Sequence, residues 1–182
     1  MRWILDDGPF GHLATVIDPQ EKTHWQADVL LVAGTTAAAA SVTSKALLNL
    51  RVGEEPLVAV FEIRVGSNDP AEQVLIELHP DTSSTTNLAE YESIAWAQEH
   101  GLDAVFVCAD KRASLTALAE LGRGRVAHPF DLWLDLRERS WLSLPAFERL
   151  CRMTREHDQG LPRMPRRIDE LLERESPGMS RT

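Results

Sequence analysis

The chain has 182 residues, of which 43% are hydrophobic and 26% are charged. This composition is typical of one globular domain with a full hydrophobic core and excludes a disordered chain. The formal net charge of -9 at pH 7 excludes general long-range attraction to a nucleic-acid backbone, so a nucleic-acid site would have to be a local one.

Two isolated cysteines, Cys108 and Cys151, fit neither a disulfide framework nor a zinc knuckle. The first ten residues lack the apolar stretch of a signal peptide, and no run approaches the roughly 20 apolar residues of a membrane helix. We therefore expect a cytoplasmic protein that does not associate with a membrane.

The first part of the chain alternates apolar runs with helical segments. Residues 3–5 form an apolar run that stops at Asp6-Asp7-Gly8-Pro9, which predicts a buried strand, a turn and a helix through Val16. Further strands are predicted at 28–32, closed by Gly34, and at 57–63, with a helix over 36–49 between them. A turn follows at 66–70, and residues 73–78 fit either a strand or a short helix.

The second part begins with a polar stretch, 79–87, which we expect to be a mobile loop. A helix is predicted from 88 to 100, a strongly apolar strand at 104–108, a helix at 113–121 and a last strand at 126–130. Residues 132 to about 172 are predicted to form helices broken at Pro145 and by 160–165. A packing or dimer surface is expected from their apolar side chains, namely Trp133, Leu134, Trp141, Leu142 and Phe147.

This alternation favours a parallel sheet with helices on both faces. The fold expected is α/β, a three-layer α/β/α arrangement around a central, mainly parallel sheet that occupies residues 1–130. A C-terminal helical extension, 131–175, is expected to pack on it, followed by a flexible tail, 176–182.

Acidic residues stand where this fold would place a site. Asp6 and Asp110 follow two of the predicted strands, and Glu90 lies in the first turn of the helix that leads into the second of them. Sites in parallel sheets form beyond the carboxyl ends of the strands. Three carboxylates gathered there would repel one another, and Mg²⁺ or Mn²⁺ would relieve the repulsion.

Each acid also has a structural interpretation. Asp6 or Asp7 could cap the following helix, and Asp110 could cap the helix after it. Glu90 stands three residues after Asn87, which is the spacing of a capping box. Spacing alone leaves these alternatives open.

The same residues resemble the PIN-domain family. The opening ILDDGPF, residues 4–10, is similar to the family's first strand and its catalytic Asp. The segment AEYESIAWAQEHG, residues 89–101, resembles the family's GExEAxxxAxxxG helix, whose first acid binds metal and maps to Glu90. LDAVFVCADKRA, residues 102–113, resembles the strand and DDRRA segment whose ligand maps to Asp110. The resemblance covers about residues 1 to 130.

The resemblance implies a PIN-like metal-dependent endoribonuclease that cuts RNA with Mg²⁺ or Mn²⁺ and that pairs with an antitoxin protein in many family members. The implied metal ligands and catalytic residues are Asp6, Glu90 and Asp110. Asp7 and Glu92 are secondary candidates because they are near neighbours. A homodimer is a further possible assembly.

Two departures from the family pattern leave an alternative open. Residues 35–50 contain no Asp or Glu where the family carries a further acid, and Ala109 stands where many relatives have Asp. A catalytically degenerate PIN-like protein-interaction module is therefore the alternative. An unrelated nucleotide- or phosphate-binding protein is a third reading, without a glycine-rich loop to support it.

Basic and imidazole side chains are further candidates for site residues. Lys111 and Arg112 directly follow Asp110 and are placed to hold a substrate phosphate. Six histidines are scattered along the chain, and none has the spacing of a helix-borne metal pair. His12, within a turn or so of Asp7, is the one singled out for testing.

Overall fold

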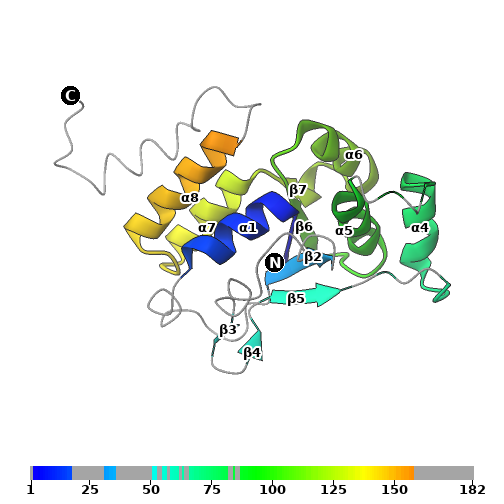
Figure 1. Cartoon of the computed structure of the whole chain (residues 1–182), viewed down its shortest axis with the longest axis horizontal. Coiled ribbons are helices and arrows are strands. Elements are labelled where there is room, and N and C mark those ends of the chain that lie inside the picture. The colour runs from blue at the N-terminus through cyan, green and yellow to red at the C-terminus, as the bar shows by residue number, and fades with distance from the viewer. Residues whose placement is uncertain are drawn as a thin grey trace.

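The computed structural model describes residues 2–17, 31–35, 51–52, 55–56, 58–61, 63, 66–81, 84 and 87–157. Within these residues the protein is a mixed α/β structure built on a five-stranded parallel sheet in the order β5-β2-β1-β6-β7 (Figure 1). The strands of this sheet are β1 (Arg2–Leu5), β2 (Leu31–Thr35), β5 (Val58–Phe61), β6 (Ala104–Val107) and β7 (Val126–Ala127). A separate antiparallel pair joins β3 (Arg51–Val52) to β4 (Glu55–Pro56).

Strand β1 lies at the centre of the sheet, between β2 and β6. Trp3 is in register with Leu31 on one side and with Val105 on the other. Because the strands are parallel, the carboxyl ends of β1 and β6 lie at the same edge of the sheet. The ladder continues one residue beyond β1, since the Asp6 amide donates to the Val107 carbonyl at 3.0 Å.

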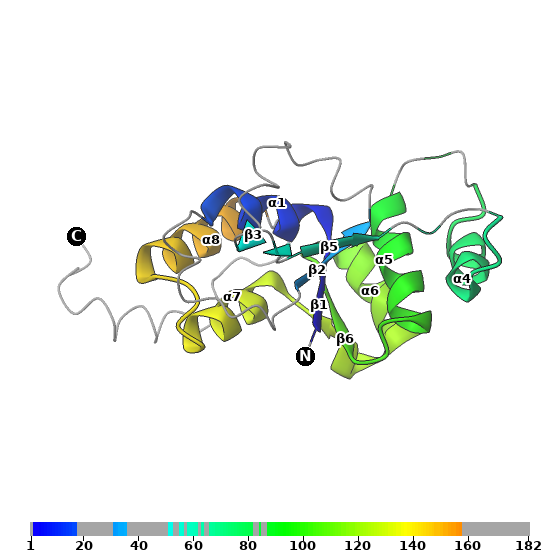
Figure 2. The ribbon, with the colours of Figure 1, turned by 90° about the horizontal axis from the view of Figure 1, so that it is seen from below.

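Helices pack against both faces of the sheet, as Figure 2 shows. Alternate side chains of β1 and β6 point to opposite faces, so Leu5 and Val107 belong to one apolar cluster and Ile4 and Phe106 to another. The first cluster includes side chains of α1 (Asp7–Val16), α7 (Pro129–Glu138) and α8 (Leu144–His157). The second includes side chains of α5 (Leu88–Glu99) and α6 (Lys111–Leu121). Helix α4 (Pro70–Leu78) packs on the outer side of α5.

Polar caps fix where several helices begin. The Asp69 side chain accepts from the Ala71 amide at 2.9 Å, and Pro70 supplies the first helical position of α4. His128 and Asp131 form a reciprocal capping box at the start of α7. Gly122, with φ of 82°, ends α6. A 3₁₀ turn, η2 (Arg123–Arg125), then leads into β7.

The predicted α/β class and the parallel sheet are confirmed, and several boundaries differ. The strand predicted at 28–32 does not close at Gly34, because β2 continues through it to Thr35. The first helix begins at Asp7, ahead of Pro9, since proline is tolerated in a first helical turn. Of the two forms predicted for 73–78, the structure has the helix, α4.

Proline also explains two boundary differences in the C-terminal part. The strand predicted at 126–130 ends at Ala127, and Pro129 begins α7. The break predicted at Pro145 is present but lies just before it, between Glu138 and Leu144, because Pro145 itself is accepted in the first turn of α8, where no helical hydrogen bond needs its missing N–H. The helix predicted at 36–49, the segment beyond 157 and the tail 176–182 lie outside the described residues.

The apolar side chains expected to form a packing or dimer surface are mostly internal. Trp133, Leu142 and Phe147 are completely buried and Leu134 is nearly so, all in the cluster that joins α7, α8 and the sheet. Trp141 is half-buried, with the Arg139 guanidinium 5.2 Å from its ring centroid. These residues therefore stabilise the fold of one chain, and the predicted homodimer stays a prediction.

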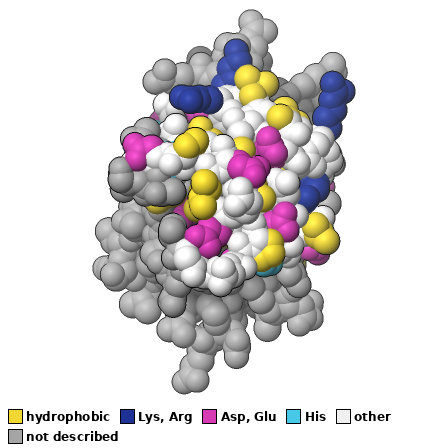
Figure 3. Space-filling model, turned by 90° about the vertical axis from the view of Figure 1, so that its right-hand side faces the viewer, with side chains coloured by type: hydrophobic (Ala, Val, Ile, Leu, Met, Phe, Trp, Pro, Cys, Tyr) yellow, Lys and Arg dark blue, Asp and Glu magenta, His cyan; other side chains and the backbone are white. Residues whose placement is uncertain are grey.

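On the side of the molecule formed by α4, α5 and α6, hydrophobic side chains are interspersed with acidic ones (Figure 3). The large exposed hydrophobic residues of the described part are Ile76, Leu102, Leu115 and Leu118. Among the described helices, none combines the length and apolar character needed to cross a bilayer.

Candidate functional site

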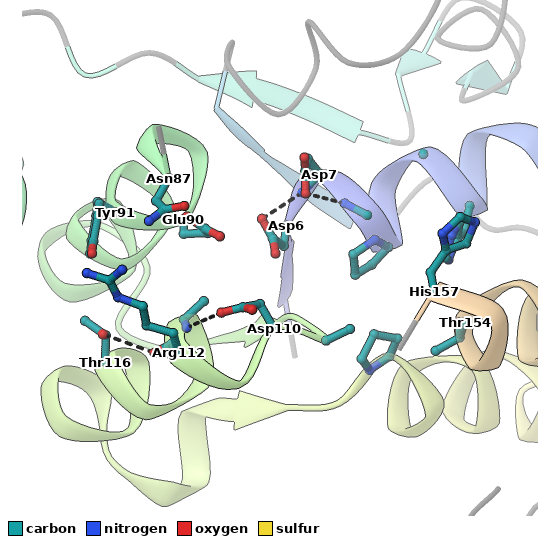
Figure 4. Close-up of a pocket in the computed structure, with 17 residues that line it drawn as sticks. Asp6, Asp7, Asn87, Glu90, Tyr91, Asp110, Arg112, Thr116, Thr154 and His157 are labelled. Carbon is teal, nitrogen blue, oxygen red and sulfur yellow. Dashed lines mark hydrogen bonds between the residues drawn. The ribbon is translucent and has the colours of Figure 1, made fainter. Parts of the chain in front are cut away.

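A cavity of about 660 Å³ opens where the N-terminal ends of α1, α5 and α6 meet. It lies beyond the carboxyl ends of β1 and β6, the position where parallel sheets form their sites. Asp6, Glu90 and Asp110 all line it, and Figure 4 shows them around one space. The predicted convergence of these three acids on one edge of the sheet is thus present in the structure.

Asp6 has two roles at the end of β1. Its Oδ1 accepts a hydrogen bond from the Asp7 amide at 2.9 Å, which caps α1. Its side chain is only 5% exposed. Burial, followed by repulsion from the Asp7 and Glu90 carboxylates, raises the pKa of Asp6 to about 8. Asp6 therefore caps a helix, as the structural interpretation allowed, and also contributes to the cavity a carboxyl group whose ionisation is opposed by burial and by its acidic neighbours.

Glu90 does not form the capping box that its spacing from Asn87 allowed. Asn87 adopts a left-handed conformation, with φ of 59°, and its side chain makes no capping hydrogen bond. The buried Oε2 of Glu90 accepts no hydrogen bond from any residue that the structure describes. Burial and then repulsion from Asp110 raise the pKa of Glu90 to about 7. A buried oxygen without a partner is costly, so the position favours a ligand.

Asp110, which follows the end of β6, is the third acid of the cavity. It caps α6, because its Oδ1 accepts from the Ala113 amide at 2.8 Å. Its side chain is exposed and lines the cavity. Both cap interpretations, for Asp6 and for Asp110, are compatible with a site, since each carboxylate has a second oxygen.

The secondary candidates separate into two groups. Asp7 and Arg112 line the cavity, and the Arg112 charge acts to lower the pKa of Glu90 against the larger effects of burial and Asp110. Lys111 is exposed and Glu92 is buried, and neither is among the lining residues. Glu92 follows Glu90 by two positions on α5, which turns its side chain to a different side of the helix.

His157 was not among the residues expected at the site, whereas its neighbour His12 was singled out for testing. His157, the last residue of α8, lines the cavity together with His12 of α1. The two ring centroids are 5.1 Å apart. No local signal identifies His157, because its place in the cavity follows from the packing of α8 against α1.

The donor set of the acidic end consists of carboxylate oxygens, which suit Mg²⁺ or Mn²⁺. Among the described residues, no three His, Cys, Asp or Glu side chains form a group that could hold a metal ion in their present positions. The raised pKa values of Asp6 and Glu90 nevertheless indicate carboxyl groups that are close enough to oppose one another's ionisation.

Comparison with known proteins does not extend this picture. The chain matches no family model, no curated protein and no solved structure. The resemblance to the PIN family therefore rests on the sequence motifs alone.

Proposed function

We propose that the protein is a PIN-like, metal-dependent endoribonuclease that hydrolyses phosphodiester bonds in RNA. The observation that carries the proposal is the convergence of Asp6, Glu90 and Asp110, from three separate segments, on one cavity at the carboxyl edge of a parallel sheet. The strand order and the helices on both faces fit a three-layer PIN-like arrangement.

In this proposal Asp6, Glu90 and Asp110 hold Mg²⁺ or Mn²⁺, which when bound supplies an activated water and stabilises negative charge on the phosphate. Among the described residues the Oε2 of Glu90 has no hydrogen-bond partner, and the ionisation of Asp6 is suppressed; both fit such an ion, because a cation favours the ionised carboxylates. The side chains would have to draw together around it.

The remaining lining residues have supporting roles in the proposal. Arg112, which lines the cavity, would bind a substrate phosphate, with Lys111 beside it on the outer surface. Affinity for RNA would then depend on a local basic contact within an acidic protein. Pairing with an antitoxin protein that covers the cavity belongs to the same proposal.

The test uses purified full-length protein with end-labelled RNA and Mn²⁺. Asp6→Asn, Glu90→Gln and Asp110→Asn should each reduce cleavage by at least about 100-fold. Asp69→Asn is the matched control, because Asp69 caps a helix in the same way but lies outside the cavity. Thermal unfolding of each variant shows whether its fold is intact.

Two results would overturn the proposal in different ways. Equal cleavage by the wild type and all three variants would identify a contaminating nuclease. An intact protein that neither cleaves RNA nor is stabilised by millimolar Mn²⁺ would favour the catalytically degenerate interaction module.

A further inference from the structure

The cavity has a second end with different chemistry. His157 reaches from the end of α8 toward α1, on the side of the cavity away from Glu90 and Tyr91 (Figure 4). Its ring and the ring of His12 have centroids 5.1 Å apart and planes inclined by 37°. Two imidazoles from distant parts of the chain therefore meet at a cavity wall.

The buried Nδ1 of His12 has no hydrogen-bond partner within the described part of the chain. His12 is half-buried, and its Nδ1 makes no hydrogen bond to any residue that the structure describes. Leaving a buried polar atom of this kind without a partner is unfavourable unless something binds it. Packing of the two rings alone leaves this nitrogen unexplained.

The electrostatics of the pair favour a neutral imidazole. Burial and the neighbouring His157 lower the pKa of His12, while Asp7 acts in the opposite direction. A neutral imidazole offers a nitrogen lone pair, which is the form that binds metal. The acidic side chains of the same cavity would attract a cation.

We propose that His12 and His157 bind one divalent transition-metal ion, such as Zn²⁺, Ni²⁺ or Co²⁺, with water as the remaining ligands. Imidazole nitrogens select these ions over Mg²⁺ and Mn²⁺, which prefer oxygen. The ion would be chemically distinct from the one proposed at the carboxylates.

The ring separation is compatible with a shared ion. At the usual Zn–N distance of about 2.0–2.1 Å, two nitrogens on one tetrahedral ion lie roughly 3.3 Å apart. Ring centroids 5.1 Å apart permit that nitrogen separation when the ring edges turn toward each other. With only two protein ligands, we expect an affinity in the micromolar range, weaker than that of a four-ligand structural site.

Binding would join the end of α8 to α1. These helices already pack against each other within the main apolar cluster, and an ion held by both would resist separation of the cavity wall. Backbone amides near His157 should then exchange more slowly with solvent when the ion is present.

The test titrates chelator-treated, full-length protein with Zn²⁺ by calorimetry and with Co²⁺ by visible absorption. The wild type should bind one ion in the micromolar range, and His157→Gln should weaken binding by more than roughly tenfold. His157 is exposed, so this variant should fold normally. His12→Gln tests the second ligand. His100→Gln is the control, because His100 caps the C-terminal end of α5 and does not line the cavity.

The outcomes separate this site from the proposed nuclease site. Asp6→Asn should abolish Mn²⁺ binding and leave Zn²⁺ binding within about threefold of the wild type. Absence of Zn²⁺ and Co²⁺ binding below about 1 mM, or binding that both histidine variants retain, would overturn the two-histidine site whatever the RNA assay shows.

Discussion

Replacing Asp6 with Asn should stabilise the metal-free protein at alkaline pH. Asn caps a helix about as well as Asp, so the hydrogen bond to the Asp7 amide is preserved. The substitution removes a charge whose formation is opposed by burial and by the neighbouring acids. Removing a helix-capping carboxylate usually destabilises a protein, so the expected sign is unusual.

The magnitude follows from the raised pKa. In the unfolded chain the Asp6 carboxyl ionises near 3.8, and in the folded protein near 8. Between these values the folded state binds more protons, so the stability of the wild type falls as pH rises, by at most about 1.4 kcal/mol per pH unit. From pH 6 to pH 8, the advantage of Asp6→Asn should therefore grow by about 2 kcal/mol.

Urea unfolding in EDTA at pH 6, 7 and 8 measures this difference. Asp69→Asn is the control of opposite sign, because the hydrogen bond from the Ala71 amide lowers the pKa of Asp69. Its carboxylate contributes stability above its unfolded pKa, so the substitution should destabilise the protein at all three pH values. An Asp6→Asn effect that is independent of pH, or destabilising at pH 8, would refute the electrostatic account of the cavity.

Three further predictions concern metal binding and packing. The affinity for Mn²⁺, measured by calorimetry, should rise by at least about tenfold per pH unit between pH 6 and pH 7. The reason is that the carboxyl groups of Glu90 and Asp6, with pKa values of about 7 and about 8, must lose protons to bind the ion. An affinity that does not change with pH would contradict carboxylate ligation. Thr154→Val should lower the free energy of unfolding in urea by about 1–3 kcal/mol, because the buried Trp133 Nε1–H loses its acceptor, the Thr154 Oγ1 at 2.9 Å. A loss below about 0.5 kcal/mol, which is the size of a surface substitution, would show that another acceptor replaces it. Gly101→Ala should lower the melting temperature, since the added Cβ would lie 2.6 Å from Cζ3 of Trp96. Gly11→Ala should raise the melting temperature, because Gly11 has open space around it and a helical backbone. Equal effects of the two substitutions would contradict the packing argument.

The sequence predicted those parts of the fold that depend on local patterns. The apolar strand that leads to Asp110 and the helix that begins before Glu90 have sharp boundaries in composition, and the structure has both. Two acids after parallel strands must emerge at one edge, so their meeting was predictable from topology. Pro129 was assigned to a strand although the first turn of a helix accepts proline, and for the same reason the helix break lies just before Pro145.

Other features of the cavity depend on tertiary packing. The backbone of Asn87 adopts a left-handed conformation, which no spacing rule could reveal, and the capping box that the spacing allowed does not form. His157 reaches the cavity because α8 folds back on α1. Raised pKa values likewise depend on burial, which for Asp6 follows from its position at the centre of the sheet.

The double duty of Asp6 and Asp110 has a consequence for how this site could change over evolution. Each side chain caps a helix as well as lining the cavity, so if the proposed catalysis were lost, capping would still favour Asp, Asn, Ser or Thr at both positions. Glu90 makes no such cap, and its buried Oε2 has no hydrogen-bond partner in the part of the chain that the structure describes. In a lineage that had lost the proposed activity, position 90 would be the first of the three to accept other residues. The residue found at this position in related chains would therefore indicate whether they retain that activity.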